Sequence, residues 1–154
     1  MHVSQDDARD GISELKSIDM ELLKQAAIEA SKRAYCPYSN YRVGAALLCT
    51  DGTIFPGCNV ENASYGLCIC AERAAILNAI SSGKNEEFPA MAVYAPDGSG
   101  IALPCGACRQ FLIEFNPKMW VLSVNADGFS YQSTWRAADL LPEFFGRSTI
   151  SLTM

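Results

Sequence analysis

Three cysteines and one glutamate stand at spacings typical of a catalytic zinc site. Cys70 and Glu72 are separated by one residue, and Cys105 and Cys108 follow further along the chain. Three thiolates can hold one zinc ion and leave its fourth tetrahedral position open, where a water molecule can be activated. Glu72 need not be a ligand, and it is well placed to move the protons of that water. The pattern therefore predicts one Zn²⁺ per chain and hydrolytic chemistry, not metal binding alone.

The charge of three thiolates requires compensation. Cys70 is predicted at the start of one helix, and Cys105 and Cys108 at the start of another. Helix N-termini carry positive potential, which lowers the pKa of a thiol and stabilises the thiolate that zinc requires. Arg73 and Arg109 each directly follow a residue of the pattern, and either can donate hydrogen bonds to the ligand sulfurs. Such bonds withdraw charge from the ligands.

Other interpretations use the same cysteines. Cys68 as a fourth ligand would close the site and make it structural, although only one residue separates it from Cys70, fewer than is usual between such ligands. Cys105 and Cys108 taken alone match a C-x-x-C redox pair, which leaves the rest of the pattern without a role. A cysteine nucleophile with a histidine base is disfavoured, because the only histidine is His2 in a polar segment.

Composition restricts the class of protein. The chain has 154 residues, a net charge of −5 and a sequence pI of about 4.8. This length favours one domain, expected over residues 17–154 after a polar leader at 1–16. Nucleic-acid binding needs basic residues to replace counterions, so an acidic chain without a basic run predicts no nucleic-acid partner. Seven cysteines, no secretory signal and no apolar run of membrane-spanning length predict a cytoplasmic protein without a membrane partner.

Hydrophobic periodicity and turn residues predict a layered α/β domain. Ser17 is expected to cap the first helix, in which Leu22 and Leu23 belong to an apolar stripe. Asp51-Gly52 predicts a two-residue hairpin turn, and Asp127-Gly128 predicts another turn. Helices are predicted from residue 17 to before Pro37 and over 70–82, 106–115 and 136–141, and strands over 43–49, 53–59, 89–95, 120–124 and 129–133. This order predicts a mixed sheet covered by helices.

Several further motifs occur in a characteristic order around the cysteines. They are Tyr35–Ser39 (YCPYS), Val43–Leu47 (VGAAL), Cys58–Tyr65 (CNVENASY), Cys70–Ala75 (CAERAA), Pro104–Gln110 (PCGACRQ) and Leu140–Pro142 (LLP). From about residue 20 to 147, the chain resembles the zinc-dependent nucleoside and nucleotide deaminases, and among them the small cytidine deaminases. The resemblance implies a three-layer cytidine-deaminase-like fold, with a mixed five-stranded sheet flanked by helices.

The resemblance also implies an activity and an assembly. The activity is zinc-dependent hydrolysis of cytidine and 2′-deoxycytidine to uridine and 2′-deoxyuridine, with release of ammonia, a reaction of pyrimidine salvage. Cys70, Cys105 and Cys108 would hold the metal, Glu72 would be catalytic, and Arg73 would support the ligand sulfurs. The partners implied are a small nucleoside substrate and three further copies of the chain, in a homotetramer whose active sites are shared between subunits.

The substrate-binding residues follow from the same resemblance. Asn59 and Glu61 would hydrogen-bond the ribose hydroxyls, as an amide and a carboxylate can. The backbone N–H of Ala71 would support the oxygen that adds to the base, and Tyr41 stands near the pyrimidine, where the family usually has Phe. Ala63 belongs to the same nucleoside-binding loop as Asn59 and Glu61.

The remaining residues concern subunit contacts. The resemblance implies that Phe145 reaches into a neighbouring subunit's site and that Tyr65 lies at a subunit contact. It assigns no role to Arg42. Three other functional classes share part of the pattern: a polynucleotide deaminase, which needs a basic surface; a zinc-stabilised binding module, which needs no Glu72; and a deaminase of an aminoglycosyl-cytosine, which has no reason to carry the Asn59 and Glu61 loop.

Overall fold

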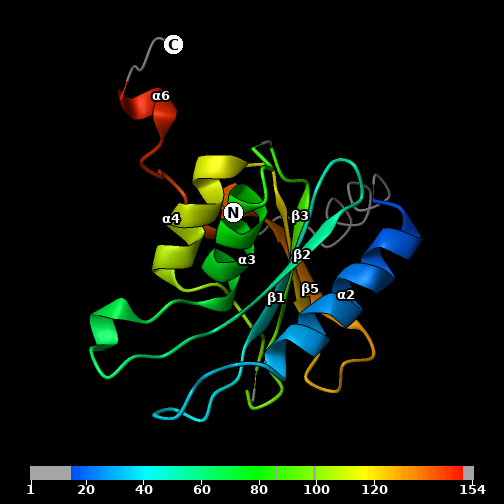
Figure 1. Cartoon of the computed structure of the whole chain (residues 1–154). Coiled ribbons are helices and arrows are strands. Elements are labelled where there is room, and N and C mark those ends of the chain that lie inside the picture. Colours follow the sequence, from blue (N-terminus) through cyan, green and yellow to red (C-terminus); the bar gives the residue numbers. More distant parts are fainter. Residues whose placement is uncertain (1–14, 86, 99, 151–154) are drawn as a thin grey trace.

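The centre of the molecule is a mixed sheet of five strands, in the order β2-β1-β3-β4-β5 (Figure 1). The computed structural model describes residues 15–85, 87–98 and 100–150. β3 and β4 are parallel, and every other neighbouring pair is antiparallel. The strands are β1 (Gly44–Leu48), β2 (Ile54–Cys58), β3 (Ala90–Tyr94), β4 (Trp120–Val124) and β5 (Tyr131–Arg136).

Helices cover both faces of this sheet. α2 (Ser17–Ser31) packs on one face, and α3 (Ala71–Ser81) and α4 (Gly106–Phe115) lie together on the other (Figure 1). The shorter elements are η1 (Tyr65–Leu67), α5 (Ala137–Leu140) and α6 (Arg147–Ile150). The predicted three-layer α/β arrangement, with a mixed five-stranded sheet flanked by helices, is confirmed.

Alternation along the strands divides the core in two. Leu47 and Val93 point toward α3 and α4, whereas Leu48 and Ala92 point toward α2, and all four are buried. β1, β3 and β4 are covered on both faces, which explains why they read as continuous apolar runs in the sequence. The sheet therefore forms a rigid support for the N-terminal ends of α3 and α4.

A glycine on β2 allows α3 to approach the sheet closely. A Cβ atom at Gly57 would lie 2.3 Å from the Ala75 nitrogen and 2.4 Å from the Ala71 oxygen, distances that no real contact allows. Only glycine fits between the two backbones. This contact fixes the first turns of α3, which carry Cys70 and Glu72.

The structure corrects two local predictions. The first hairpin has a three-residue turn and not a two-residue one, because Cys49 N–H donates to the Thr53 oxygen and Gly52 N–H donates to the Cys49 oxygen. Gly52 has a φ of 85°, as expected for the glycine that ends such a turn. The last strand begins at Tyr131 and not at residue 129, because the Asp127-Gly128 turn closes with Asn125 N–H on the Ser130 oxygen.

Two predictions at the first helix are also wrong. Lys16 occupies the capping position, with Ser17 as the first helical residue. Leu22 is 53% exposed, whereas Leu23 is fully buried, because the stripe that faces the sheet passes through Leu23, Ala27 and Ala30. The helix ends at Ser31, before Pro37 as predicted. No described helix is both long and apolar enough to cross a bilayer. Most of the predicted leader lies outside the described residues.

Candidate active site

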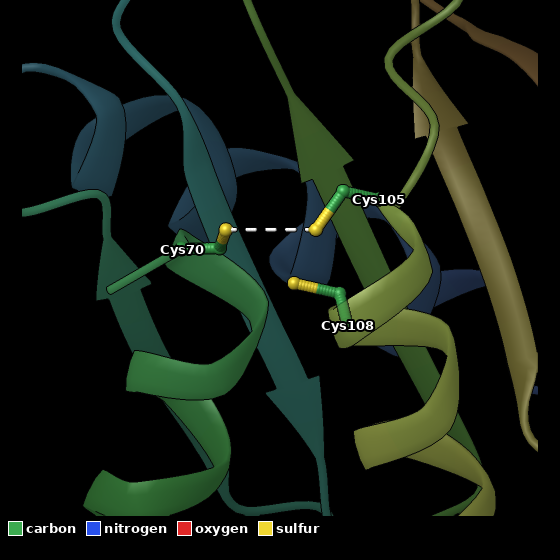
Figure 2. Close-up of side chains that lie close together, drawn as sticks. All are labelled: Cys70, Cys105 and Cys108. Atoms are coloured by element: carbon green, nitrogen blue, oxygen red, sulfur yellow. Dashed lines mark hydrogen bonds between the residues drawn. The ribbon is translucent and has the colours of Figure 1, made fainter. Parts of the chain in front are cut away.

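Three cysteine sulfurs converge where α3 and α4 begin (Figure 2). Cys70 is the N-cap residue of α3, Cys105 is the N-cap residue of α4, and Cys108 lies in the first turn of α4. Their Sγ atoms all lie within 4.8 Å of one another, and the Cys70 and Cys105 sulfurs are 3.8 Å apart. The predicted cluster is thus assembled from two helix N-termini that are far apart in the sequence.

This donor set fits zinc. Two sulfurs bound to one tetrahedral zinc at about 2.3 Å lie about 3.8 Å from each other, which is the separation of Cys70 and Cys105. The pKa of Cys70 is lowered to about 5, chiefly by a hydrogen bond from the Cys108 thiol and further by Arg73 and Cys105. The thiolate form that a metal needs is therefore favoured at this sulfur.

Glu72 lies in the first turn of α3, beside the sulfur cluster but outside it. Its side chain is almost completely buried, with 4% of the residue exposed. Burial is the main cause that raises the pKa of Glu72 to about 7, and the charge of the Cys70 thiolate contributes to the same shift. A carboxyl group with such a pKa can both accept and donate a proton near neutral pH.

The two arginines considered in the sequence behave differently. Arg73 Nη2 donates to the Cys68 oxygen at 3.0 Å and lies 3.9 Å from the Cys70 sulfur, so it supports a ligand sulfur. Arg109 does not, because its Nε donates to the Pro104 oxygen and its Nη1 to the Leu140 oxygen. The prediction that either arginine compensates the sulfur charge is wrong for Arg109, which instead ties α4 to the C-terminal segment.

The sulfur of Cys68 contacts the backbone of Asn62 and not the other sulfurs. Its Sγ accepts from the Asn62 N–H at 3.3 Å and lies 3.7 Å from the Asn62 oxygen. It is not part of the group of sulfurs that gathers at Cys70. The structure thus favours three cysteine ligands and an open fourth position over a closed structural site.

A cavity of about 490 Å³ leads from the sulfur cluster to the loop after β2. Seven of the predicted site residues line it: Tyr41, Asn59, Glu61, Cys70, Ala71, Glu72 and Cys105. Most of the other lining side chains are apolar, among them Val43, Val93 and Leu103. The volume and mixed lining suit a small organic molecule with a few polar groups.

Glu61 lines this cavity from the loop after β2, not from the helix starts that carry the sulfurs. One of its carboxylate oxygens accepts from the backbone N–H groups of Tyr38 and Ser39, at 2.9 and 3.2 Å, and the other pairs with the Ser39 hydroxyl. These bonds, with the hydroxyl contributing most, lower the pKa of Glu61. The group is therefore an ionised acceptor at neutral pH.

Asn59 is already engaged with the backbone. Its Oδ1 accepts from the Val43 N–H and its Nδ2 donates to the Tyr41 oxygen, both at 2.8 Å. An amide has two donors and an oxygen with two lone pairs, so capacity remains for a ligand hydroxyl. The sequence did not predict this second role, in which Asn59 fixes the segment that enters β1.

Three of the seven predicted substrate-binding residues do not line the cavity. Ala63 and Tyr65 lie in the exposed loop after β2, and Phe145 lies near the C-terminal end of the described chain. Tyr65 is 72% exposed and Phe145 60% exposed. The sequence also gave no signal for Asp97, which binds Arg42 across 55 residues of chain.

Three sulfurs at two helix N-termini, a buried carboxyl group and an adjoining cavity on an α/β sandwich define a class of metal-dependent hydrolase. The comparisons with known proteins agree. The family model described as the cytidine and deoxycytidylate deaminase zinc-binding region matches residues 17–124. The chain therefore belongs to the cytidine and deoxycytidylate deaminase family.

Individual relatives cover most of the chain. It is 45% identical to a cytidine deaminase of Sporosarcina psychrophila, over 87% of this chain and 96% of the relative. A solved cytidine deaminase structure from Burkholderia pseudomallei is 48% identical, with a TM-score of 0.75 over 80% of this chain and 97% of that one. One from Mycobacterium tuberculosis is 41% identical, with a TM-score of 0.70 over 83% and 98%.

Proposed function

We propose that the protein hydrolyses cytidine and 2′-deoxycytidine to uridine and 2′-deoxyuridine, with release of ammonia. The observation that carries this proposal is the position of Glu72. This carboxyl group is buried beside the three sulfurs and lines the same cavity as Glu61. A proton carrier, a metal site and a hydroxyl acceptor thus face one cavity, and the relatives named above are cytidine deaminases.

The metal centre is assigned to Cys70, Cys105 and Cys108. Zinc bound there would act as a Lewis acid that lowers the pKa of a water in its open position. Arg73 draws charge from the Cys70 sulfur, which opposes the excess negative charge of three thiolates. The N–H of Ala71, the first residue of α3, points out of the helix end, where it has no intrahelical acceptor and can donate to an oxygen at the reacting carbon.

Glu72 carries the protons of the reaction. It accepts a proton from the water that adds at C4 and delivers it to N3, which makes C4 more electrophilic. It then transfers the second proton to the amino group, the bond between C4 and nitrogen breaks, and ammonia leaves. The pKa of about 7 allows one carboxyl group to act as base and as acid in turn.

The other end of the cavity selects the substrate. Glu61 and Asn59 are placed to accept and donate hydrogen bonds to sugar hydroxyls. The described residues that line the cavity include the acidic side chains of Glu61 and Glu72 and no lysine, arginine or histidine. A 5′-phosphate would approach this negative charge without a basic partner, so we assign a free nucleoside as substrate and not a nucleotide or polynucleotide.

Assembly and location are part of the proposal. Tyr65 and Phe145 are large exposed aromatic side chains outside the cavity, which suits the homotetramer with shared active sites that the resemblance implies. Cys36, Cys49 and Cys58 lie outside the metal cluster and form no disulfide with another described cysteine, which suits a protein kept in the reducing cytoplasm.

The test is a direct assay of the purified protein. Zinc per chain is measured by atomic emission, and ultraviolet absorbance is followed with cytidine, 2′-deoxycytidine, cytidine 5′-monophosphate and a cytosine-containing oligonucleotide. The proposal predicts one zinc per chain and turnover of the two nucleosides only. Turnover of the oligonucleotide in preference to the nucleosides, or no turnover by the zinc-replete protein, would overturn it.

A further inference from the structure

Arg42, to which the motifs assign no role, makes a three-point contact with Asp97. Its backbone N–H and Nε donate to Oδ2 of Asp97 at 3.0 and 2.8 Å, and its Nη2 donates to Oδ1 at 2.7 Å. The Arg42 guanidinium holds the pKa of Asp97 at about 2, so the pair is ionised across the neutral range. The contact joins the segment that enters β1 to the turn that follows β3.

The pair is too exposed to be important for stability. The side chain of Arg42 is 48% exposed and that of Asp97 29% exposed. Ion pairs of this exposure contribute little to folding. A bidentate guanidinium–carboxylate pair does, however, fix the relative orientation of the two segments that carry it. Its significance therefore lies in which residues it holds in place.

The residues on either side of Arg42 are held from the opposite side. Asn59 accepts from the Val43 N–H and donates to the Tyr41 oxygen. Asn59 follows β2 and Asp97 follows β3, and β1 lies between these two strands in the sheet. The residues that lead into β1, Tyr41 to Val43, are thus held by side chains that follow both neighbouring strands.

Tyr41 is the residue that this double attachment brings into the cavity. It lines the cavity with Ala95 and Leu103, yet 40% of the residue is exposed. Its ring packs against the turn that carries Asp97: a Cβ atom at Gly98 would lie only 2.9 Å from the Tyr41 hydroxyl oxygen. The ring therefore depends on this turn for its position, and Arg42 and Asp97 fasten the turn to the Tyr41 backbone.

We propose that Asp97 and Arg42 are positioning residues, whose ion pair holds the Tyr41 wall of the cavity in place for the nucleoside base. The inference rests on the proposed function. Neither side chain lines the cavity, so their effect on the reaction passes through Tyr41. A displaced wall weakens binding of the base and leaves Glu72 and the sulfur cluster intact. The signature is a change in KM without a comparable change in kcat.

The test is a double-mutant cycle on the zinc-loaded protein with cytidine as substrate. Asp97→Ala is expected to raise KM about tenfold and to leave kcat within about twofold of wild type. Zinc content and the shape of the pH profile of kcat/KM should be unchanged. Tyr41→Ala raises KM by itself, and in that background Asp97→Ala adds no further increase. Arg42→Ala should reproduce Asp97→Ala.

Lys84→Ala is the matched control. It removes the ion pair between Lys84 and Asp51, which also joins distant segments of the chain. The two side chains are 27% and 52% exposed, and neither residue lines the cavity. Its KM should equal that of wild type. Should Asp97→Ala fail to fold, Asp97→Asn keeps the side-chain shape and is expected to show the same rise in KM.

Two results would overturn the inference. One is a wild-type KM in the Asp97 variants, and the other is a KM increase that adds fully to that of Tyr41→Ala. If wild type deaminates cytidine while either result holds, only the positioning role fails. If zinc-loaded wild type does not deaminate cytidine, the proposed function fails, and the inference fails with it.

Discussion

The two ends of the cavity are built in different ways. At the metal end, Cys70, Glu72 and Cys105 lie at the N-terminal ends of α3 and α4, which pack on buried strands. At the other end, which we propose binds the sugar and call the sugar end, Glu61 and Asn59 lie in a loop that is held by hydrogen bonds between side chains and backbone. One end is fixed by the core of the domain and the other by a few polar contacts.

This difference matches what each end must do. Three sulfurs must keep the separations that one zinc requires, and Glu72, the proposed proton carrier, must be buried for its pKa to rise. The sugar end must admit and release a polar ligand, which a packed core does not allow. Damage at the metal end should therefore remove zinc or turnover, whereas damage at the sugar end should weaken binding.

The largest effect is expected from loss of a ligand sulfur. Cys70→Ala should lose zinc and turnover, together with the stabilisation that zinc gives to the fold, which is on the order of 10 kcal/mol at such sites. Cys68→Ala is the control, because its sulfur contacts Asn62 and not the cluster, and it should keep one zinc per chain. Zinc content and thermal unfolding decide this, and a zinc-replete Cys70→Ala would make Cys68 a ligand.

A pair of glycine substitutions compares the packed strand beside α3 with the exposed loop after β2 without touching a polar group. Gly57→Ala forces a Cβ atom against the backbone of α3 and should lower the free energy of unfolding by about 1–3 kcal/mol. Gly66→Ala, in the exposed loop, meets no atom within 4 Å and should change it by less than about 0.5 kcal/mol. Urea unfolding measures both. Equal effects would contradict the view that only the metal end depends on close packing.

A smaller effect is expected at the sugar end. Glu61→Gln replaces an ionised acceptor by an amide and should lower kcat/KM for cytidine about tenfold, mainly through KM. 2′,3′-Dideoxycytidine lacks the 2′ and 3′ hydroxyls that Glu61 is proposed to bind, so its kcat/KM should be the same in the variant and in wild type. Equal losses with both substrates would mean that Glu61 only holds the backbone of Tyr38 and Ser39.

The metal end was predictable from the sequence because the residues of each half of the site are close together in the chain. Cys70 and Glu72 belong to one helix start and Cys105 and Cys108 to another, and the periodicity that follows each motif gives the helix. α4 is found over Gly106–Phe115 as predicted, and the predicted site of three sulfurs is confirmed as a cluster. Only the contact between the two helix starts needed the fold.

The sugar end was less predictable because its contacts join segments that are distant in the sequence. Asp97 binds Arg42 across 55 residues, and Asn59 binds the backbone on both sides of Arg42. No periodicity or spacing encodes such pairs, and half-exposed polar residues carry no hydrophobic signal. The same reason explains Arg109, whose partners are the Pro104 and Leu140 oxygens and not a sulfur.

The most direct test of the account is the turnover of Glu72→Gln in the zinc-loaded protein. Gln keeps the shape of the side chain but cannot carry a proton, so the variant should fold, keep one zinc per chain and bind nucleoside. Its turnover of cytidine, followed by ultraviolet absorbance, should fall by at least about 100-fold. Near-normal turnover by the zinc-replete variant would contradict the account.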